Sequence, residues 1–142
     1  MALDGLGQLQ AMVDGAMPPP PIMSTLGFTD LRPERGRVVV EMPAAEFHYN
    51  PIGVVHVGLA LALLDSAMGC AVHSTLAAGV GYTTLEVKVN FVRPLTSATG
   101  PVRCTGTLVH DGRTVATAEG RLVGLDGKLY AHGTSTLLIV GG

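Results

Sequence analysis

Asp65 is the residue of this 142-residue sequence best placed for chemistry, because it stands alone among uncharged side chains. Between Phe47 and Leu85 it is the only Asp, Glu, Lys or Arg. A carboxylate withdrawn from water is costly unless a partner solvates or neutralises it. We therefore predict that Asp65 serves as a base or a nucleophile. The structural alternative is an aspartate that bonds to nearby backbone or lies at a contact between subunits.

The predicted element around Asp65 is a long buried helix. Residues 56–77 are mostly apolar, and a helix of that length spans about 30 Å. Gly79 and Gly81 follow it and supply a helix stop. Residues 43–55 contain proline and glycine that break regular structure, so we predict a loop that leads into the helix.

Strands are predicted on both sides of this helix. Two precede it and form a hairpin around a turn at 32–36; they cover residues 22–31 and 37–42. Four follow it as a meander; they cover residues 82–92, 102–110, 114–122 and 128–140. In the first of these four, strict alternation puts Leu85 on one face and Thr84 on the other, together with Glu86.

The first 21 residues are predicted to form a separate segment. Leu3, Leu6 and Leu9 have helical spacing within residues 2–16, and the four prolines at 18–21 end that helix and favour an extended linker. Residues 22–142 then form one domain. The segment at 1–21 has acidic residues and no basic run, unlike a signal peptide.

Composition favours a homo-oligomer. Charged residues make up 14% of the sequence, against roughly 25% in a typical soluble domain. A surface so poor in charge suggests that other subunits cover part of it. The net charge of −2 and the absence of a Lys or Arg cluster argue against nucleic acid as a partner.

Membrane insertion and metal binding are not predicted. Residues 52–72 are the only candidate span, but His56 and Asp65 interrupt them. Cys70 and Cys104 are isolated in apolar surroundings, which suits a reduced, cytoplasmic compartment better than a disulfide framework. The histidines and cysteines lack the spacing of metal ligands, so we expect no metal.

Two motifs resemble those of the PaaI-type acyl-CoA thioesterases. The segment Asn50-Pro-x-Gly-x-x-His-x-Gly58 is similar to the family pattern N-P-x-G-x-x-H-G-G, and Leu63-Leu-Asp-Ser-Ala67 is similar to L-x-D-x-A. Residues 84–94 and 116–120 match further, and the resemblance covers about residues 22–140. It implies an α+β hotdog fold, in which a curved antiparallel sheet wraps a long central helix. It also implies hydrolysis of an acyl-CoA or aryl-CoA to the free acid and coenzyme A, with no further cofactor.

One position departs from the family pattern. Val57 replaces the first glycine of H-G-G, where the resemblance implies that the backbone N–H holds the thioester oxygen. A backbone donor survives a side-chain change if its dihedral angles do. Valine is stiffer and bulkier, so it can narrow the acyl pocket or shift the amide. We expect the departure to affect substrate range more than reaction type.

The helix start and Asp65 are too far apart to act on one carbonyl within one chain. Val57 and Gly58 lie at the predicted helix N-terminus, where free N–H groups suit a developing oxyanion. Asp65 is eight residues further, a rise of about 12 Å. We therefore predict a site between two protomers, and the resemblance agrees: it implies active sites at a dimer interface. The predicted assembly is a dimer or a homotetrameric dimer of dimers.

Several residues have two open interpretations. For Asn50 the resemblance implies an amide that orients water or the thioester, and the alternative is an Asx turn. For Thr84 it implies a hydroxyl that orients the attacking water, and the alternative is an ordinary strand threonine. His56 either hydrogen-bonds the substrate or braces the loop. Arg93 and Arg113 follow strands, where they either bind coenzyme A phosphates or remain solvated.

Two other functions compete with hydrolysis. A hotdog hydratase or dehydratase pairs an acid with a histidine near a G-D-x-N-P-x-H-like segment, but Asn50-Pro51 lacks the preceding Gly-Asp here. An acyl-CoA-binding module would hold thioesters without turnover. Asp65 argues against that module, and Val57 argues weakly for it.

Overall fold

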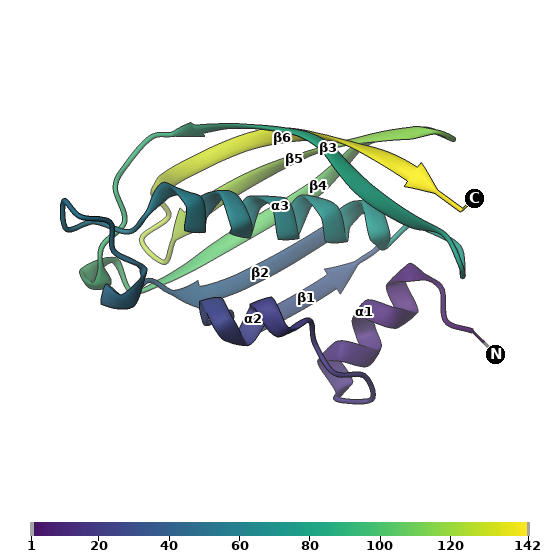
Figure 1. Ribbon diagram of the computed structural model, residues 1–142, viewed down its shortest axis with the longest axis horizontal. Helices are drawn as coiled ribbons and strands as arrows, with labels where there is room; N and C mark the ends of the chain where they lie inside the picture. Colours follow the sequence, from purple (N-terminus) through teal and green to yellow (C-terminus); the bar gives the residue numbers. More distant parts are fainter. Residues whose placement is uncertain (1, 142) are drawn as a thin grey trace.

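A computed structural model describes residues 2–141, in which one antiparallel sheet curves around a long helix (Figure 1). The helix is α3 (Val57–His73). The six strands are β1 (Asp30–Glu34), β2 (Arg37–Pro43), β3 (Gly81–Phe91), β4 (Pro101–Asp111), β5 (Val115–Gly124) and β6 (Leu129–Val140). The shorter helical elements are α1 (Gly5–Asp14), α2 (Pro21–Leu26), η1 (Glu46–His48) and η2 (Ser97–Thr99). The predicted α+β hotdog architecture is confirmed.

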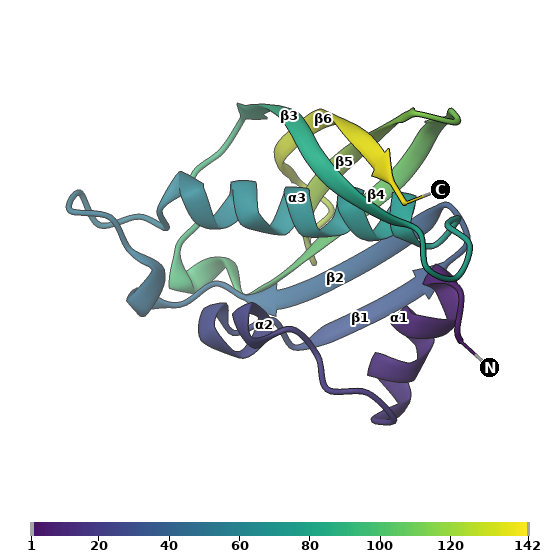
Figure 2. The ribbon, with the colours of Figure 1, turned by 45° about the vertical axis from the view of Figure 1, so that its right-hand side comes forward.

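The order of the strands differs from the predicted meander. It is β1-β2-β4-β5-β6-β3, so β4, β5 and β6 form a meander while β3 lies beyond β6 at the sheet edge. The chain leaves β2, crosses the sheet as α3 and returns on the far side (Figure 2). The apolar pattern of a strand indicates which face it buries but not which neighbour it pairs with, so the sequence could not place β3.

The predicted first strand at 22–31 is largely wrong, because α2 occupies its first half and β1 begins only at Asp30. Pro21 stands at the first helical position, where its fixed φ favours a helix start. Gly27 ends the helix with a φ of 86°. The predicted turn at 32–36 is also too long: Glu34 pairs with Arg37 and only two residues turn between them.

The central helix ends at His73, four residues before the predicted end at 77. The residues that follow the helix form hydrogen bonds with distant parts of the chain. Ser74 accepts a hydrogen bond through its hydroxyl oxygen from the N–H of Gly36 at 2.7 Å, and the Leu76 carbonyl accepts one from the N–H of Gly5 at 2.9 Å. None of the helices within residues 2–141 has both the length and the apolarity needed to cross a membrane.

Small residues allow α3 to lie directly on the sheet. Gly106, Gly120 and Gly133 are aligned in register across β4, β5 and β6. A Cβ atom at Gly106 would collide with the backbone carbonyl of Ala67 on α3. The close approach buries Leu63, Leu64 and Met68 completely. The sheet therefore fixes one side of the helix and determines which side remains open.

The predicted N-terminal helix is present as α1, but it ends at Asp14 with Gly15 as its cap, before the prolines, and it packs beside the sheet. Asp4 caps α1 by accepting a hydrogen bond from the N–H of Gly7 at 2.8 Å. Leu9 is buried in the core, and Gln8 bonds through its Oε1 to Nε2 of His73 at 2.8 Å. α1 and α2 thus form an additional wall below α3 and next to β1 (Figures 1 and 2).

Candidate active site

Asp65 lies in the middle of α3 on the side that the sheet does not cover completely. Its side chain is half-buried. Oδ1 accepts a hydrogen bond from the Thr84 hydroxyl of β3 at 2.9 Å. Within residues 2–141 the other carboxylate oxygen has no hydrogen-bond partner. One oxygen is therefore fixed in place while the second is available to a ligand.

Thr84 reaches Asp65 because β3 is irregular. The pairing of β3 with β6 shifts between Thr84 and Glu86, which makes Leu85 a bulge residue. A bulge adds one residue and reverses the alternation beyond it. Thr84 consequently lines the same groove as Val87, and the predicted placement of Thr84 on the face of Glu86 is wrong. The strict alternation read from the sequence did not allow for the extra residue.

The start of α3 is capped by His56. Its Nδ1 accepts a hydrogen bond from the N–H of Gly58 at 2.8 Å. The N–H of Val57 has no acceptor among the residues described here, and the Val57 side chain is 51% exposed. Val57 adopts the helical backbone conformation of the first turn, so the position does not require glycine. The available backbone donor at this end of the helix is therefore that of Val57.

An open groove runs along α3 beside β3. It has a volume of about 340 Å³ and is lined by Gly58, Leu61, Ala62, Asp65, Thr84 and Val87. Because β3 is the last strand of the sheet, its outer edge is unpaired within the described chain. Leu61 in the groove and Leu85 on the bulge are exposed by 39% and 56%. These features suit contact with another protein surface.

Asp65 also borders a second cavity, and Val57 borders a third. The second, of about 310 Å³, lies between α3 and the N-terminal helices. The third, of about 230 Å³, lies at the start of α3 and includes His56, Val57 and Arg93. The Arg93 Nε donates a hydrogen bond to the Leu129 carbonyl at 3.4 Å, so this guanidinium is held near the cavity.

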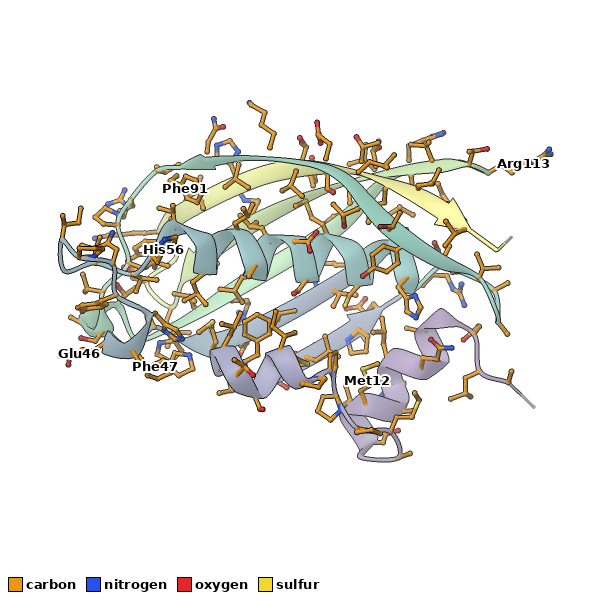
Figure 3. All side chains as sticks on the ribbon, viewed as in Figure 1. Met12, Glu46, Phe47, His56, Phe91 and Arg113 are labelled. Carbon is orange, nitrogen blue, oxygen red and sulfur yellow. The ribbon has the colours of Figure 1, made fainter. Side chains whose placement is uncertain are left out.

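Asn50 and Arg113, two of the predicted site residues, line none of these three cavities. Asn50 accepts hydrogen bonds through Oδ1 from the N–H groups of Ile52 and Val54, at 3.0 and 3.2 Å, in the manner of an Asx turn. Its side-chain oxygen therefore already accepts hydrogen bonds within its own loop. Arg113 lies in the turn between β4 and β5, at the opposite end of the molecule from His56 (Figure 3).

Comparison with known families identifies the chain. The family model of the thioesterase superfamily matches residues 52–131. The chain belongs to this superfamily. The match includes both the start of α3 and Asp65, so the prediction of a thioester hydrolase is confirmed.

Individual relatives of this thioesterase agree with that assignment. A protein of Saccharolobus solfataricus named as an inferred esterase is 33% identical over 107 residues, which cover 75% of this chain and 74% of that protein. The phenylacetic acid degradation-related protein of Ralstonia eutropha, described as an inferred thioesterase, is 32% identical, with a TM-score of 0.82 over 92% of this chain and 98% of its own.

Two further solved structures extend the comparison. The PaaI protein of Escherichia coli shares the fold, with 22% identity and a TM-score of 0.82 over 96% of this chain and 97% of its own. Together with the superfamily match and the 32% identical Ralstonia eutropha protein, this shared fold confirms the resemblance to PaaI-type hotdog thioesterases. The smu.793 protein of Streptococcus mutans, solved with bound acetyl CoA, is 26% identical, with a TM-score of 0.73 over 81% of this chain and 90% of its own.

Sequence reasoning missed Cys70 and Tyr82, which border Asp65 on the side that faces the N-terminal helices. Burial raises the pKa of the Cys70 thiol to about 11, and the charge of Asp65 adds to the rise. Burial also raises the pKa of Tyr82, with smaller contributions from Cys70 and Asp65. The signal available in the sequence was Gly69, one turn after Asp65, where a Cβ atom would lie only 2.6 Å from the Tyr82 hydroxyl.

The described residues offer no group of three or more His, Cys, Asp or Glu side chains arranged to hold a metal ion. The polar groups that border Asp65 include the hydroxyls of Thr84 and Ser66, the thiol of Cys70 and the phenol of Tyr82. This set can accept and donate protons and hydrogen bonds around one carboxylate.

Proposed function

We propose that this thioesterase hydrolyses an acyl-CoA or aryl-CoA at a site shared by two protomers of a homo-oligomer. Asp65 of one protomer acts as general base or nucleophile, and the N–H of the partner subunit's Val57 donates to the thioester oxygen. The observation that carries the proposal is the separation of these two groups on one helix. Asp65 lines an open groove beside an unpaired strand edge, while the Val57 amide is presented eight residues away.

Hydrolysis adds water across the bond between the acyl carbon and sulfur. With Asp65 as base, its free oxygen takes a proton from water, the water oxygen bonds to the acyl carbon, and the thiolate leaves and is protonated. With Asp65 as nucleophile, its oxygen forms an anhydride with the acyl group as the thiolate leaves, and water then opens that anhydride. In both routes a backbone donor stabilises the oxyanion by about 2.7–4 kcal/mol.

Thr84 and Gly58 complete the groove in this proposal. Thr84 uses its one hydroxyl hydrogen on Asp65, and its oxygen can still accept a hydrogen bond from the attacking water. Thr84 thus positions the base and the water together. Gly58 lines the groove without a side chain, which leaves room for the thioester.

The carrier part of the substrate has candidate partners at the start of α3. The bound acetyl CoA of the Streptococcus mutans relative supports a coenzyme A ligand here. Arg93 borders the cavity next to Val57 and is suited to a phosphate group. No resident cofactor takes part, since coenzyme A arrives with the substrate. A dimer of dimers would contain four such sites.

Thiol release from a panel of acyl-CoAs by wild type and Asp65→Asn tests the proposal. Asparagine retains an oxygen that can accept from Thr84, so the fold should be kept. We expect kcat to fall by about 10³-fold while substrate binding is retained. Transfer of ¹⁸O from labelled water into Asp65 in a single turnover would indicate the nucleophilic route.

Other outcomes distinguish the alternatives. A wild type that binds acyl-CoA and never releases thiol would be a binding module. Addition of water to an enoyl-CoA without thiol release would indicate a hydratase. An Asp65→Asn variant as active as wild type would contradict the proposed role of this carboxylate.

A further inference from the structure

We propose that the acyl group of the substrate is uncharged and apolar, and that it occupies the cavity between α3 and the N-terminal helices. The inference rests on the proposed hydrolysis at Asp65. The cavity has a volume of about 310 Å³, at the lower end of the range of about 300–1,000 Å³ found for ligand sites. It would make α1 and α2 the elements that select the substrate.

The position of Asp65 connects this cavity to the reacting bond. Asp65 borders both the open groove, with Gly58 and Thr84, and the N-terminal cavity, with Ser66 and Cys70. In a thioester whose carbonyl carbon lies against Asp65, the sulfur and the acyl chain extend from that carbon in different directions. If the sulfur and its carrier follow the groove, the acyl group extends into the N-terminal cavity.

The lining of the cavity is suited to an apolar group. Most of it is aliphatic, aromatic or thioether surface, including Met12 of α1, Ile22 and Met23 of α2, and Phe28. Met12 lies on α1, below the C-terminal half of α3 (Figure 3). Methionine side chains adapt to ligands of different shape, so the walls can accommodate aliphatic and aromatic groups.

The polar groups of the lining do not provide a positive charge. Burial lowers the pKa of His73, whose Nε2 bonds to Gln8 and whose buried Nδ1 lacks a partner among the described residues. The raised pKa values of Cys70 and Tyr82 keep both groups protonated and neutral near pH 7. Neither Lys nor Arg lines the cavity in the described chain. An acyl group that ends in a carboxylate would be desolvated there without a cation to pair with it.

The two helices that close the cavity are anchored to the hotdog core. α1 is held by Gly5 and Gln8, which bond to Leu76 and His73. The carbonyl of Leu26, at the end of α2, bonds to Nε2 of His48 at 2.7 Å. Both helices precede residue 52, where the match to the thioesterase superfamily begins. The reaction and the selection of the acyl group are therefore assigned to different segments of the chain.

Hexanoyl-CoA and adipyl-CoA provide a matched test, because they differ only in a terminal carboxylate. We expect kcat/KM of the wild-type protein to be at least about 100-fold higher for hexanoyl-CoA. Ile22 is half-exposed, so Ile22→Arg should fold and should supply a cation to the cavity. The preference should then fall by about tenfold or more, mainly through faster turnover of adipyl-CoA.

Leu125→Arg is the control variant, since Leu125 is 68% exposed in the turn after β5 and does not line this cavity. It should leave the preference unchanged. Met12→Trp, which fills the cavity, should shift the preferred acyl chain to fewer carbons. Equal rates on both substrates, or a preference that Ile22→Arg and Met12→Trp leave unaltered, would overturn the acyl-site assignment alone. Absence of thiol release from every acyl-CoA would instead overturn the proposed function and this inference with it.

Discussion

The middle and the beginning of α3 differ in how many contacts and hydrogen bonds they receive from the rest of the same chain. Asp65, in the middle, is half-buried, receives a hydrogen bond from β3 and borders two cavities. Val57, at the beginning, has a half-exposed side chain and an N–H without an acceptor in residues 2–141. The chain thus positions its carboxylate by its own fold, whereas it presents its backbone donor outward.

This difference explains how valine can stand where the family pattern has glycine. At the helix start the proposed mechanism uses only the N–H, and the first turn of a helix accepts a β-branched residue without strain at φ. In the middle of the helix the proposed mechanism uses the Asp65 side chain itself, which has to be in contact with Thr84. We therefore expect a change of residue type to be tolerated at Val57 and not at Asp65.

Replacement of Val57 by proline isolates the contribution of the backbone donor. Proline removes the N–H, is favoured at the first helical position, and suits the extended ψ of 130° at His56. We expect kcat to fall by roughly 10²–10³-fold, with a free energy of unfolding within about 0.5 kcal/mol of wild type. Val57→Ala, which keeps the N–H, is the matched control and should remain active.

Mixing the Val57→Pro and Asp65→Asn proteins tests whether two chains share the site. A mixed dimer contains one site that combines an intact Asp65 with an intact Val57 amide from the other chain. Random exchange should therefore restore about a quarter of the wild-type activity in a two-fold symmetric dimer. If both groups acted within one chain, every site in the mixture would lack one of them and no activity would return.

The architecture was largely predictable from the sequence because its signals are local. The apolar run around Asp65 indicates the central helix, and the alternating segments indicate five of the six strands. The placement of β3 beside β6 depends on pairing between distant segments, which the burial pattern of one strand does not encode. The helix at 21–26 was missed because Pro21 was interpreted as part of a linker and not as the first residue of a helix.

The candidate site was predictable in composition but not in geometry. Asp65 stood out as a lone charge, and the motif around Asn50 and His56 marked the helix start. The contact between Thr84 and Asp65 depends on one bulge residue, Leu85. No turn-forming residue beside it indicates a bulge in the sequence. The cavity next to α1 is built from segments more than forty residues apart, such as Met12 and Asp65, so residue spacing could not reveal it.

Thr84→Val tests whether turnover at Asp65 depends on the hydrogen bond that this side chain receives from β3. Valine retains the shape and the strand preference of threonine but removes the hydroxyl that donates to Asp65. A hydrogen bond to a charged group contributes about 1.5 kcal/mol, so kcat/KM should fall about tenfold. Thr83→Val is the control, because Thr83 is exposed next to it on β3. Equal activities of the two variants would show that the bond does not position the base.

His56 gives the smallest expected effect and separates support of the helix start from chemistry. Its Nδ1 caps α3 through the N–H of Gly58, so His56→Ala should lower the free energy of unfolding by about 1 kcal/mol. His56→Asn supplies another side-chain acceptor and should restore most of that loss, as measured by urea denaturation. If His56 only braces the helix start, turnover of an acyl-CoA should recover together with stability in His56→Asn. Recovery of stability without recovery of kcat would instead assign the imidazole a direct contact with the substrate.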